Sequence, residues 1–217
     1  MFADFQDLRE RILVECIKSA NSVFDKEIPG FVKLAESRMW YGFGEPGGPL
    51  YSPPLRCRAM ETTKTDFAFS GGEAEIPEDY LDKRHIYWPS NPIASPNYEA
   101  PAVFWPLRMA NAGASRPSAY TIEGQSCYIR PALTGDATLL YYKKLTHLVE
   151  SGDSNWILAN APAAYFYGTL IEAWRHLRNA EKVTEAFAGY SGAVSALNGT
   201  EARARFSGGR MVRRATW

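Results

Sequence analysis

Apolar residues recur at helical spacing near both ends of the chain. Within residues 4–20 they stand three or four positions apart, and the Asp4 carboxylate is placed to accept the first backbone N–H groups of a helix. A second helix is expected from about Ile28-Pro29, because proline suits a first turn. Towards the C-terminus, one helix should begin near Pro162 and another should end at Asn198-Gly199. The apolar positions of that last helix are Val183, Phe187, Tyr190, Val194 and Leu197.

From Arg56 to about Leu145 the pattern changes to one typical of strands. Alternating or β-branched runs lie between clusters of glycine, proline and asparagine. Ile76-Pro-Glu-Asp-Tyr-Leu is expected to end a strand and turn into a short helical step, and Glu123-Gly124 to form a tight hairpin turn. The expected strand runs include residues 58–63, 66–70, 83–88, 103–109 and 139–143. The pattern predicts a β-meander of about five to seven short strands, as a sandwich or half-barrel.

These patterns together predict an α+β fold. A helical bundle formed by the N- and C-terminal helices would carry an inserted antiparallel β-sandwich or meander domain. The last segment has five arginines and no acidic residue, which is typical of a flexible basic tail. The expected division is residues 1–54 for the N-terminal helices, 55–149 for the β-rich domain, 150–202 for C-terminal helices that pack with the N-terminal ones, and 203–217 for the tail.

The overall charge limits the classes of partner. Lys and Arg total 24, as do Asp and Glu, so the chain of 217 residues is not a general electrostatic binder of nucleic acid. Three widely separated cysteines argue against a disulfide framework and a metal site, and we expect reduced, buried thiols. Charges near the N-terminus argue against a signal peptide, and the longest weakly polar run is too short to cross a bilayer. We therefore expect no membrane partner.

Catalytic patterns are weak throughout. His85, His147 and His176 share no metal-ligand spacing and are expected to be exposed or partly buried. A Gly-x-Ser-x-Gly elbow is missing, and the glycines of residues 42–48 follow a helix and lack the Lys-Ser/Thr of a phosphate loop. We expect no enzyme activity, no cofactor and no catalytic or metal-binding residue.

Two segments are candidate interaction surfaces. The tail can order on a protein partner, form a solubilising end or contact DNA phosphates, and we favour the protein partner. A glycine-rich loop with aromatic residues can contact another subunit or fold over its own core. The tail candidates are Arg203, Arg205, Arg210, Arg213, Arg214 and Trp217. The loop candidates are Trp40, Tyr41, Phe43, Leu50 and Tyr51.

Five short motifs, in order over roughly residues 4–200, resemble the head-tail adaptor (connector) proteins of tailed bacteriophages, of the podovirus type. One departure is Ala163, because an acidic residue usually follows the proline that opens this helix in the family. The loop of residues 41–54 is also richer in glycine and aromatics. The motifs are Ile28-Pro-Gly-Phe-Val-Lys-Leu-Ala-Glu, Ile76-Pro-Glu-Asp-Tyr-Leu, Tyr120-Thr-Ile-Glu-Gly-Gln-Ser-Cys-Tyr-Ile-Arg-Pro, Leu140-Tyr-Tyr-Lys-Lys and Ala161-Pro-Ala-Ala-Tyr-Phe-Tyr-Gly-Thr-Leu.

The resemblance implies a structural protein of the virion, assembled in the host cytoplasm. Copies, commonly twelve in this family, would form a ring under the portal protein and extend the channel for double-stranded DNA, without sequence specificity. The tail would dock on the portal, and the lower face would meet a downstream tail or nozzle protein. The alternatives are a tail-tube or stopper ring protein, and a carbohydrate-binding β module of a tail protein. In that module, aromatic side chains would stack on sugars: Tyr87, Trp88, Tyr98, Phe104 and Trp105.

Overall fold

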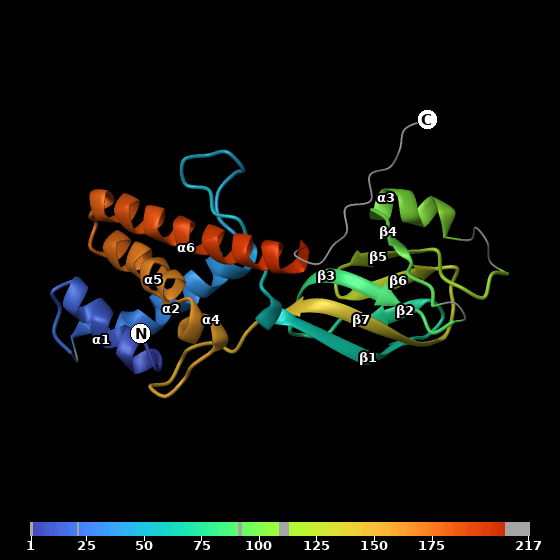
Figure 1. The fold of residues 1–217 in the computed structure, drawn as a ribbon, viewed down its shortest axis with the longest axis horizontal. Coiled ribbons are helices and arrows are strands. Elements are labelled where there is room, and N and C mark those ends of the chain that lie inside the picture. Colours follow the sequence, from blue (N-terminus) through green and yellow to red (C-terminus); the bar gives the residue numbers. More distant parts are fainter. Residues whose placement is uncertain (1, 21, 91–92, 109–112, 207–217) are drawn as a thin grey trace. The chain divides into compact units, whose positions relative to one another are not determined.

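The computed structural model describes residues 2–20, 22–90, 93–108 and 113–206 (Figure 1). The chain divides into two compact units. The first, the helical unit, takes in the chain up to Ala59 and again from Leu145 onward. The second, the β unit, is continuous from Met60 to Lys144. Helices at the chain ends and strands in the middle confirm the predicted α+β class.

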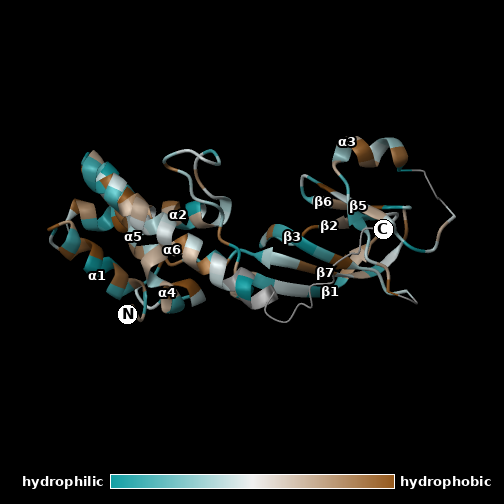
Figure 2. Cartoon of the chain, turned by 45° about the horizontal axis from the view of Figure 1, so that its top comes forward, coloured by the Kyte–Doolittle hydropathy of each residue, from teal (hydrophilic) through white to brown (hydrophobic). Residues whose placement is uncertain are grey.

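The N-terminal part of the helical unit contains α1 (Phe5–Glu15) and α2 (Val23–Tyr41). The predicted cap is confirmed, because the Asp4 carboxylate accepts the Asp7 N–H at 3.1 Å. Brown and teal stretches alternate along α1 in Figure 2, as expected for an amphipathic helix. The predicted start of the second helix was wrong. Ser22 caps α2 five residues earlier than expected through the Asp25 N–H, so Pro29 lies inside the helix.

The C-terminal part contains α4 (Trp156–Asn160), α5 (Pro162–His176) and α6 (Ala180–Phe206). Pro162 opens α5 as predicted, but the predicted end of the last helix at Asn198-Gly199 was wrong. Gly199 keeps a negative φ, and the Asn198 side chain bonds to the distant Pro54 and Arg56 instead of capping its own helix. The helix therefore continues to Phe206, through the first residues of the expected tail.

Close packing at Gly168 joins the two halves of the helical unit. A Cβ built on this α5 residue would lie 3.1 Å from Ala35 of α2 and 3.4 Å from the Tyr190 ring of α6. A larger side chain would therefore push the three helices apart. The core around this point is apolar and includes Ile28, Val32, Ala35, Met39, Tyr165, Ile171, Tyr190 and Val194.

The β unit contains seven strands within the described residues: β1 (Glu61–Phe69), β2 (Glu73–Glu75), β3 (Tyr80–Tyr87), β4 (Asn97–Tyr98), β5 (Ala119–Glu123), β6 (Ser126–Arg130) and β7 (Gly135–Lys143). They form one sheet of order β1-β7-β3 and another of order β2-β6-β5-β4. The predicted hairpin is confirmed, with Gly124 at φ +61° between the paired Glu123 and Ser126. Residues of both sheets build one core, which includes Phe67, Phe69, Ile86, Ile129 and Leu139.

Two predictions within the β unit were wrong. Residues 103–107, expected in a strand, belong to the short helix α3 (Pro101–Phe104) and the 3₁₀ turn Trp105–Leu107. Prolines at the start of each turn favour helical dihedrals there over the alternation of apolar residues. The expected helical step at Ile76–Leu81 is instead a turn, closed by the Tyr80 N–H to the Pro77 carbonyl at 2.9 Å, from which β3 begins.

Candidate functional site

The candidate loop begins where α2 ends, at Gly42. Gly42 has φ +76°, and an added Cβ would lie 3.0 Å from both the Pro54 ring and the Ser52 carbonyl oxygen. Phe43 and Ser52 then exchange two backbone hydrogen bonds of 2.9 Å. The base of the loop is therefore a tight two-stranded neck that glycine makes possible.

Asn198 of α6 holds the returning end of this loop. Its Nδ2 donates to the Pro54 carbonyl at 3.1 Å, and its Oδ1 accepts the Arg56 N–H at 3.0 Å. Arg56 Nη1 in turn donates to the Trp40 carbonyl at 2.9 Å. Both ends of the loop are thus tied to the helices, while residues 44–47 and 49–50 remain exposed. In Figure 1 the loop extends away from the neighbouring helices.

The five predicted loop residues separate into two groups. Tyr41 is 61% exposed and Leu50 is 39% exposed, so their side chains are accessible. Trp40 is buried, with its ring 4.7 Å from the His147 ring, while Phe43 and Tyr51 are half-buried. Trp40 therefore belongs to the unit's own core, and Tyr41, the last residue of α2, and Leu50 have the most exposed side chains of the five.

A charged cluster lies beside the neck of the loop. Arg38 of α2 pairs with Glu172 of α5, although both side chains are largely buried. Arg175 lies 3.3 Å from the same carboxylate oxygen and is 40% exposed. Both guanidinium groups approach the Phe43 ring, at 5.0 Å for Arg38 and 5.5 Å for Arg175. The cluster therefore links α2, α5 and the loop through cation–π and ionic contacts.

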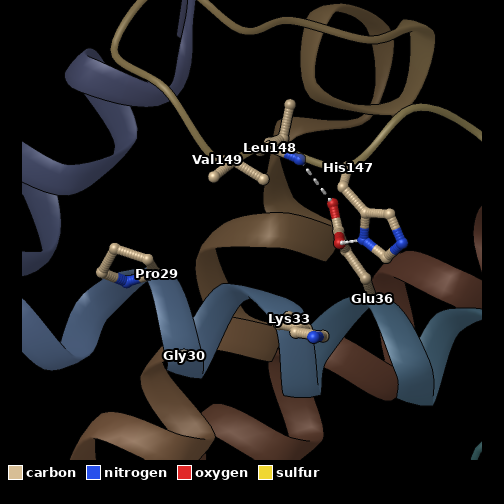
Figure 3. Close-up of a pocket in the computed structure, with 7 residues that line it drawn as sticks. All are labelled: Pro29, Gly30, Lys33, Glu36, His147, Leu148 and Val149. Atoms are coloured by element: carbon tan, nitrogen blue, oxygen red, sulfur yellow. Dashed lines mark hydrogen bonds and ion pairs between the residues drawn. The ribbon is translucent and has the colours of Figure 1, made fainter.

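A second polar network centres on Glu36, whose side chain is only 1% exposed (Figure 3). Its Oε1 accepts the Leu148 N–H at 3.0 Å and the Tyr165 hydroxyl at 2.9 Å. Its Oε2 lies 2.5 Å from His147 Nδ1. Burial and the negative charge of Glu36 raise the pKa of Tyr165 well above its ordinary value, so this phenol keeps the proton that it donates. The network fixes His147 and Leu148 to α2, just after the chain returns from the β unit to the helical unit.

A cavity of about 340 Å³ adjoins this network. Its lining contains no hydroxyl or thiol that the Glu36–His147 pair could activate as a nucleophile. Among the described residues, no group of three or more His, Cys, Asp or Glu side chains could hold a metal ion. The contacts that the structure shows link Glu36 of α2 to His147, Leu148 and Tyr165. Its cavity is lined by Pro29, Gly30, Lys33, Glu36, His147, Leu148 and Val149.

The sequence prediction missed the role of Glu36, although a signal was present. The residue follows Val32 by four positions and precedes Met39 by three, so it falls on the apolar face of α2. A carboxylate at such a position requires hydrogen-bond donors from elsewhere in the fold. Those donors come from residues more than one hundred positions away, which the pattern cannot identify.

The candidate tail is only partly described. Arg203 and Arg205 lie in the last turns of α6, and Arg203 is exposed. Arg210, Arg213, Arg214 and Trp217 lie outside the described residues. Within the part of the chain that the structure describes, none of the helices combines the length and apolar character needed to cross a membrane.

Two of the five aromatic residues proposed for sugar stacking are buried. Trp88 is 7% exposed and packs against Phe69 with ring centres 5.9 Å apart, and Phe104 is fully buried. Trp105 is 38% exposed, but its indole N–H donates to Glu123 and its ring faces Tyr128. Tyr87 and Tyr98 are about 40% exposed. Trp88 and Phe104 therefore belong to the core, and Tyr87, Tyr98 and Trp105 are the rings that keep exposed surface.

The family model described as SU10 adaptor protein matches residues 3–214. The chain therefore belongs to the SU10 adaptor protein family. The resemblance to phage head-tail adaptors is thereby confirmed, and the protein is a phage adaptor and a component of the virion. A search of curated proteins found no match.

Proposed function

We propose that copies of this protein form a closed ring beneath the portal, extend the DNA channel and join the head to the next tail component. The observation that carries the proposal is the family match over residues 3–214. A closed ring of identical subunits needs two different patches on each copy that fit one another. Twelve copies are the number that the resemblance implies.

The last turn of α2 and the exposed part of the loop together are our candidate for one of these patches. Tyr41 of α2 and Leu50 of the loop are accessible, and the neck of the loop is held by Gly42, Asn198 and the Phe43–Ser52 pair. A rigid support with exposed aromatic and aliphatic groups loses little conformational entropy on binding. The net charge of zero also suits a channel through which DNA must slide.

The basic segment after α6 is our candidate for docking on the portal. Arg203 marks the exposed end of a long helix, and Arg210, Arg213, Arg214 and Trp217 follow it in the sequence. Arginine and tryptophan are the residue types most enriched in binding hot spots. A segment that orders on its partner can cover a large surface, at some cost in entropy.

Light scattering of the protein, mixed with the portal of its own phage, tests the ring. We expect a mass increase of about a dozen subunits that requires the portal. A ring formed by the protein alone would favour the tail-tube or stopper alternative. A protein that stays monomeric and does not bind the portal would contradict the proposed adaptor ring.

Substitution of the tail arginines tests the docking segment. Replacing Arg210, Arg213 and Arg214 by Ser should weaken portal binding at least tenfold, because several charge-assisted hydrogen bonds would be lost. The matched variant with Lys at all three positions keeps the positive charge but lacks the guanidinium groups. It therefore separates the effect of guanidinium geometry from that of charge. Unchanged portal affinity of the Ser variant would show that the segment does not dock.

A further inference from the structure

A small notch opens at the neck of the loop, between the C-terminal turns of α2 and α5. It has a volume of about 260 Å³, which is below the roughly 300–1,000 Å³ of cofactor and small-molecule sites. A space of this size suits a single side chain of a partner. We call it the arginine notch, and its walls include Leu34, Arg38, Tyr41, Phe43, Glu172 and Arg175.

The notch carries an excess of positive charge. Arg38 and Arg175 face one carboxylate, and both use the same oxygen of Glu172. The Arg38 side chain is about 95% buried, yet its Nε–H has no hydrogen-bond partner. Its Nη1 makes only a long contact of 3.5 Å to the Gly168 carbonyl. A buried guanidinium with an unused donor is an incomplete arrangement that an additional acceptor would satisfy.

The helix dipole does not explain this arrangement fully. Both arginines lie in last turns, where a positive charge is favoured by the partial negative charge of the helix end. That effect accounts for their position in the sequence. It does not account for the unpaired Nε–H of a buried side chain that lines an open notch.

The residues that line the notch favour one kind of hydrogen-bond acceptor. Phe43 lies within 5.5 Å of both guanidinium groups and limits their orientation. Leu34 is 54% exposed and Tyr41 is 61% exposed, so the rim offers apolar surface to the stem of an incoming side chain. Glu172 repels a multiply charged phosphate, and no lysine lines the notch. A carboxylate on a short apolar stem fits these properties better than the DNA backbone.

We propose that the arginine notch binds a glutamate or aspartate side chain of a protein partner. The carboxylate would accept from the exposed Arg175 and, after a shift of the Arg38 side chain that uncovers its buried Nε–H, from Arg38, and its methylene groups would lie against the apolar rim. The proposal deepens the proposed assembly role, because it gives one contact a definite chemistry. Its first test requires neither portal nor ring, so its failure can be distinguished from theirs.

Side-chain NMR of the ¹⁵N-labelled full chain tests the notch, with N-acetyl-glutamate amide as the probe. We expect a saturable shift of the Arg38 Nε–H resonance, and no such shift with the neutral N-acetyl-glutamine amide. Absence of saturation with the glutamate probe, or an equal response to both probes, would overturn the proposal. Tighter binding of inorganic phosphate at the same resonance would overturn it in favour of a phosphate site.

Two variants extend this test. Arg175→Gln should weaken the binding of the glutamate probe about tenfold, since it removes one charged hydrogen-bond donor. Arg11→Gln removes an exposed, ion-paired arginine outside the notch and should leave the affinity unchanged. Amide spectra of each variant show whether the helical unit remains folded. A folded Arg175→Gln variant that binds the probe as tightly as the parent would contradict the assignment.

Discussion

The two units bury different kinds of side chain. The β unit is built from one continuous stretch, and its core cluster contains aliphatic and aromatic residues with one cysteine. The helical unit is built from two stretches and buries Asp25, Glu36 and Arg38. Among the described residues of the β unit, Arg130 is the one ionisable side chain of Asp, Glu, Lys or Arg type that is buried to this degree.

Two of these three buried charges connect the two stretches of the helical unit, while Asp25 pairs with Arg9 within the first stretch. Arg38 meets Glu172, and Glu36 meets His147 and Tyr165, across more than one hundred residues of sequence. Apolar burial drives collapse but has no direction, whereas hydrogen bonds require particular partners. We infer that polar pairs determine which segments meet in the helical unit, while backbone strand pairing, including the long-range pairs β1–β7 and β3–β7, has that role in the β unit.

The largest expected effect concerns isolated fragments. Residues 60–144 should fold alone, because they contain their own core. Residues 1–59 should stay largely unfolded, since the buried face of α2 packs on α5 at Gly168. Circular dichroism and amide exchange measure both fragments. A cooperatively folded 1–59 fragment would remove the distinction between the two units.

The next effect concerns Glu36→Ala. The change leaves the buried Leu148 N–H and Tyr165 hydroxyl without their acceptor, so the free energy of unfolding of the helical unit should fall by about 2–4 kcal/mol. Thiol labelling in urea reports the units separately, through Cys57 in one and Cys127 in the other. Burial raises the pKa of Cys127 to about 12, which suppresses labelling of the folded β unit at neutral pH.

The matched control for this experiment is Glu36→Gln. The amide keeps one oxygen acceptor at nearly the same volume, so the loss should be smaller than with alanine. Labelling of Cys127 should be unchanged in both variants. An equal increase in the labelling of Cys57 and Cys127 would contradict a role confined to the helical unit.

A smaller effect is expected at the loop neck. Gly42→Ala places a Cβ at positive φ and close to Pro54, and should destabilise the helical unit by about 1–2 kcal/mol. Gly47→Ala also has positive φ, but no atom lies within 4 Å of its added Cβ. Thermal unfolding of the two variants separates backbone strain from steric contact. The steric explanation fails if both variants have the same melting temperature.

The smallest effect is a pH dependence at Asp153. Its carboxylate accepts the Val149 and Glu150 N–H groups at 2.7 Å, and these bonds lower its pKa. The turn should be fully stabilised above the unfolded pKa of about 3.9, and this stabilisation should be lost as the pH falls through the lower folded value. Amide exchange at Val149 and Glu150 measures the loss. Asp153→Asn should remove this pH dependence, and its persistence in that variant would point to another group.

The sequence predicted the elements that depend on neighbouring residues. The Asp4 cap, the Pro162 helix start and the Gly124 hairpin are local arrangements, and each was confirmed. The strand expected at residues 103–109 was wrong because alternating apolar residues do not exclude a proline-initiated turn. The end of α6 was wrong because Asn198 has a distant partner.

The candidate site could be predicted only in outline. Glycines and aromatics indicated the loop, but the burial of Trp40 depends on His147, and the position of Phe43 depends on two arginines from separate helices. The partners of Glu36 and Arg38 lie in a part of the chain separated from them by the whole β unit. Such pairs have no signal in the spacing of a single sequence.

Native mass spectrometry of the portal mixed with the full chain or with residues 1–206 tests the central claim most directly. The truncation removes the residues after α6 and leaves the described helical unit intact. The account predicts a portal complex with about twelve copies of the full chain, and loss of this complex with the truncated chain. A truncated chain that binds the portal with the same stoichiometry and affinity would contradict docking through the basic segment.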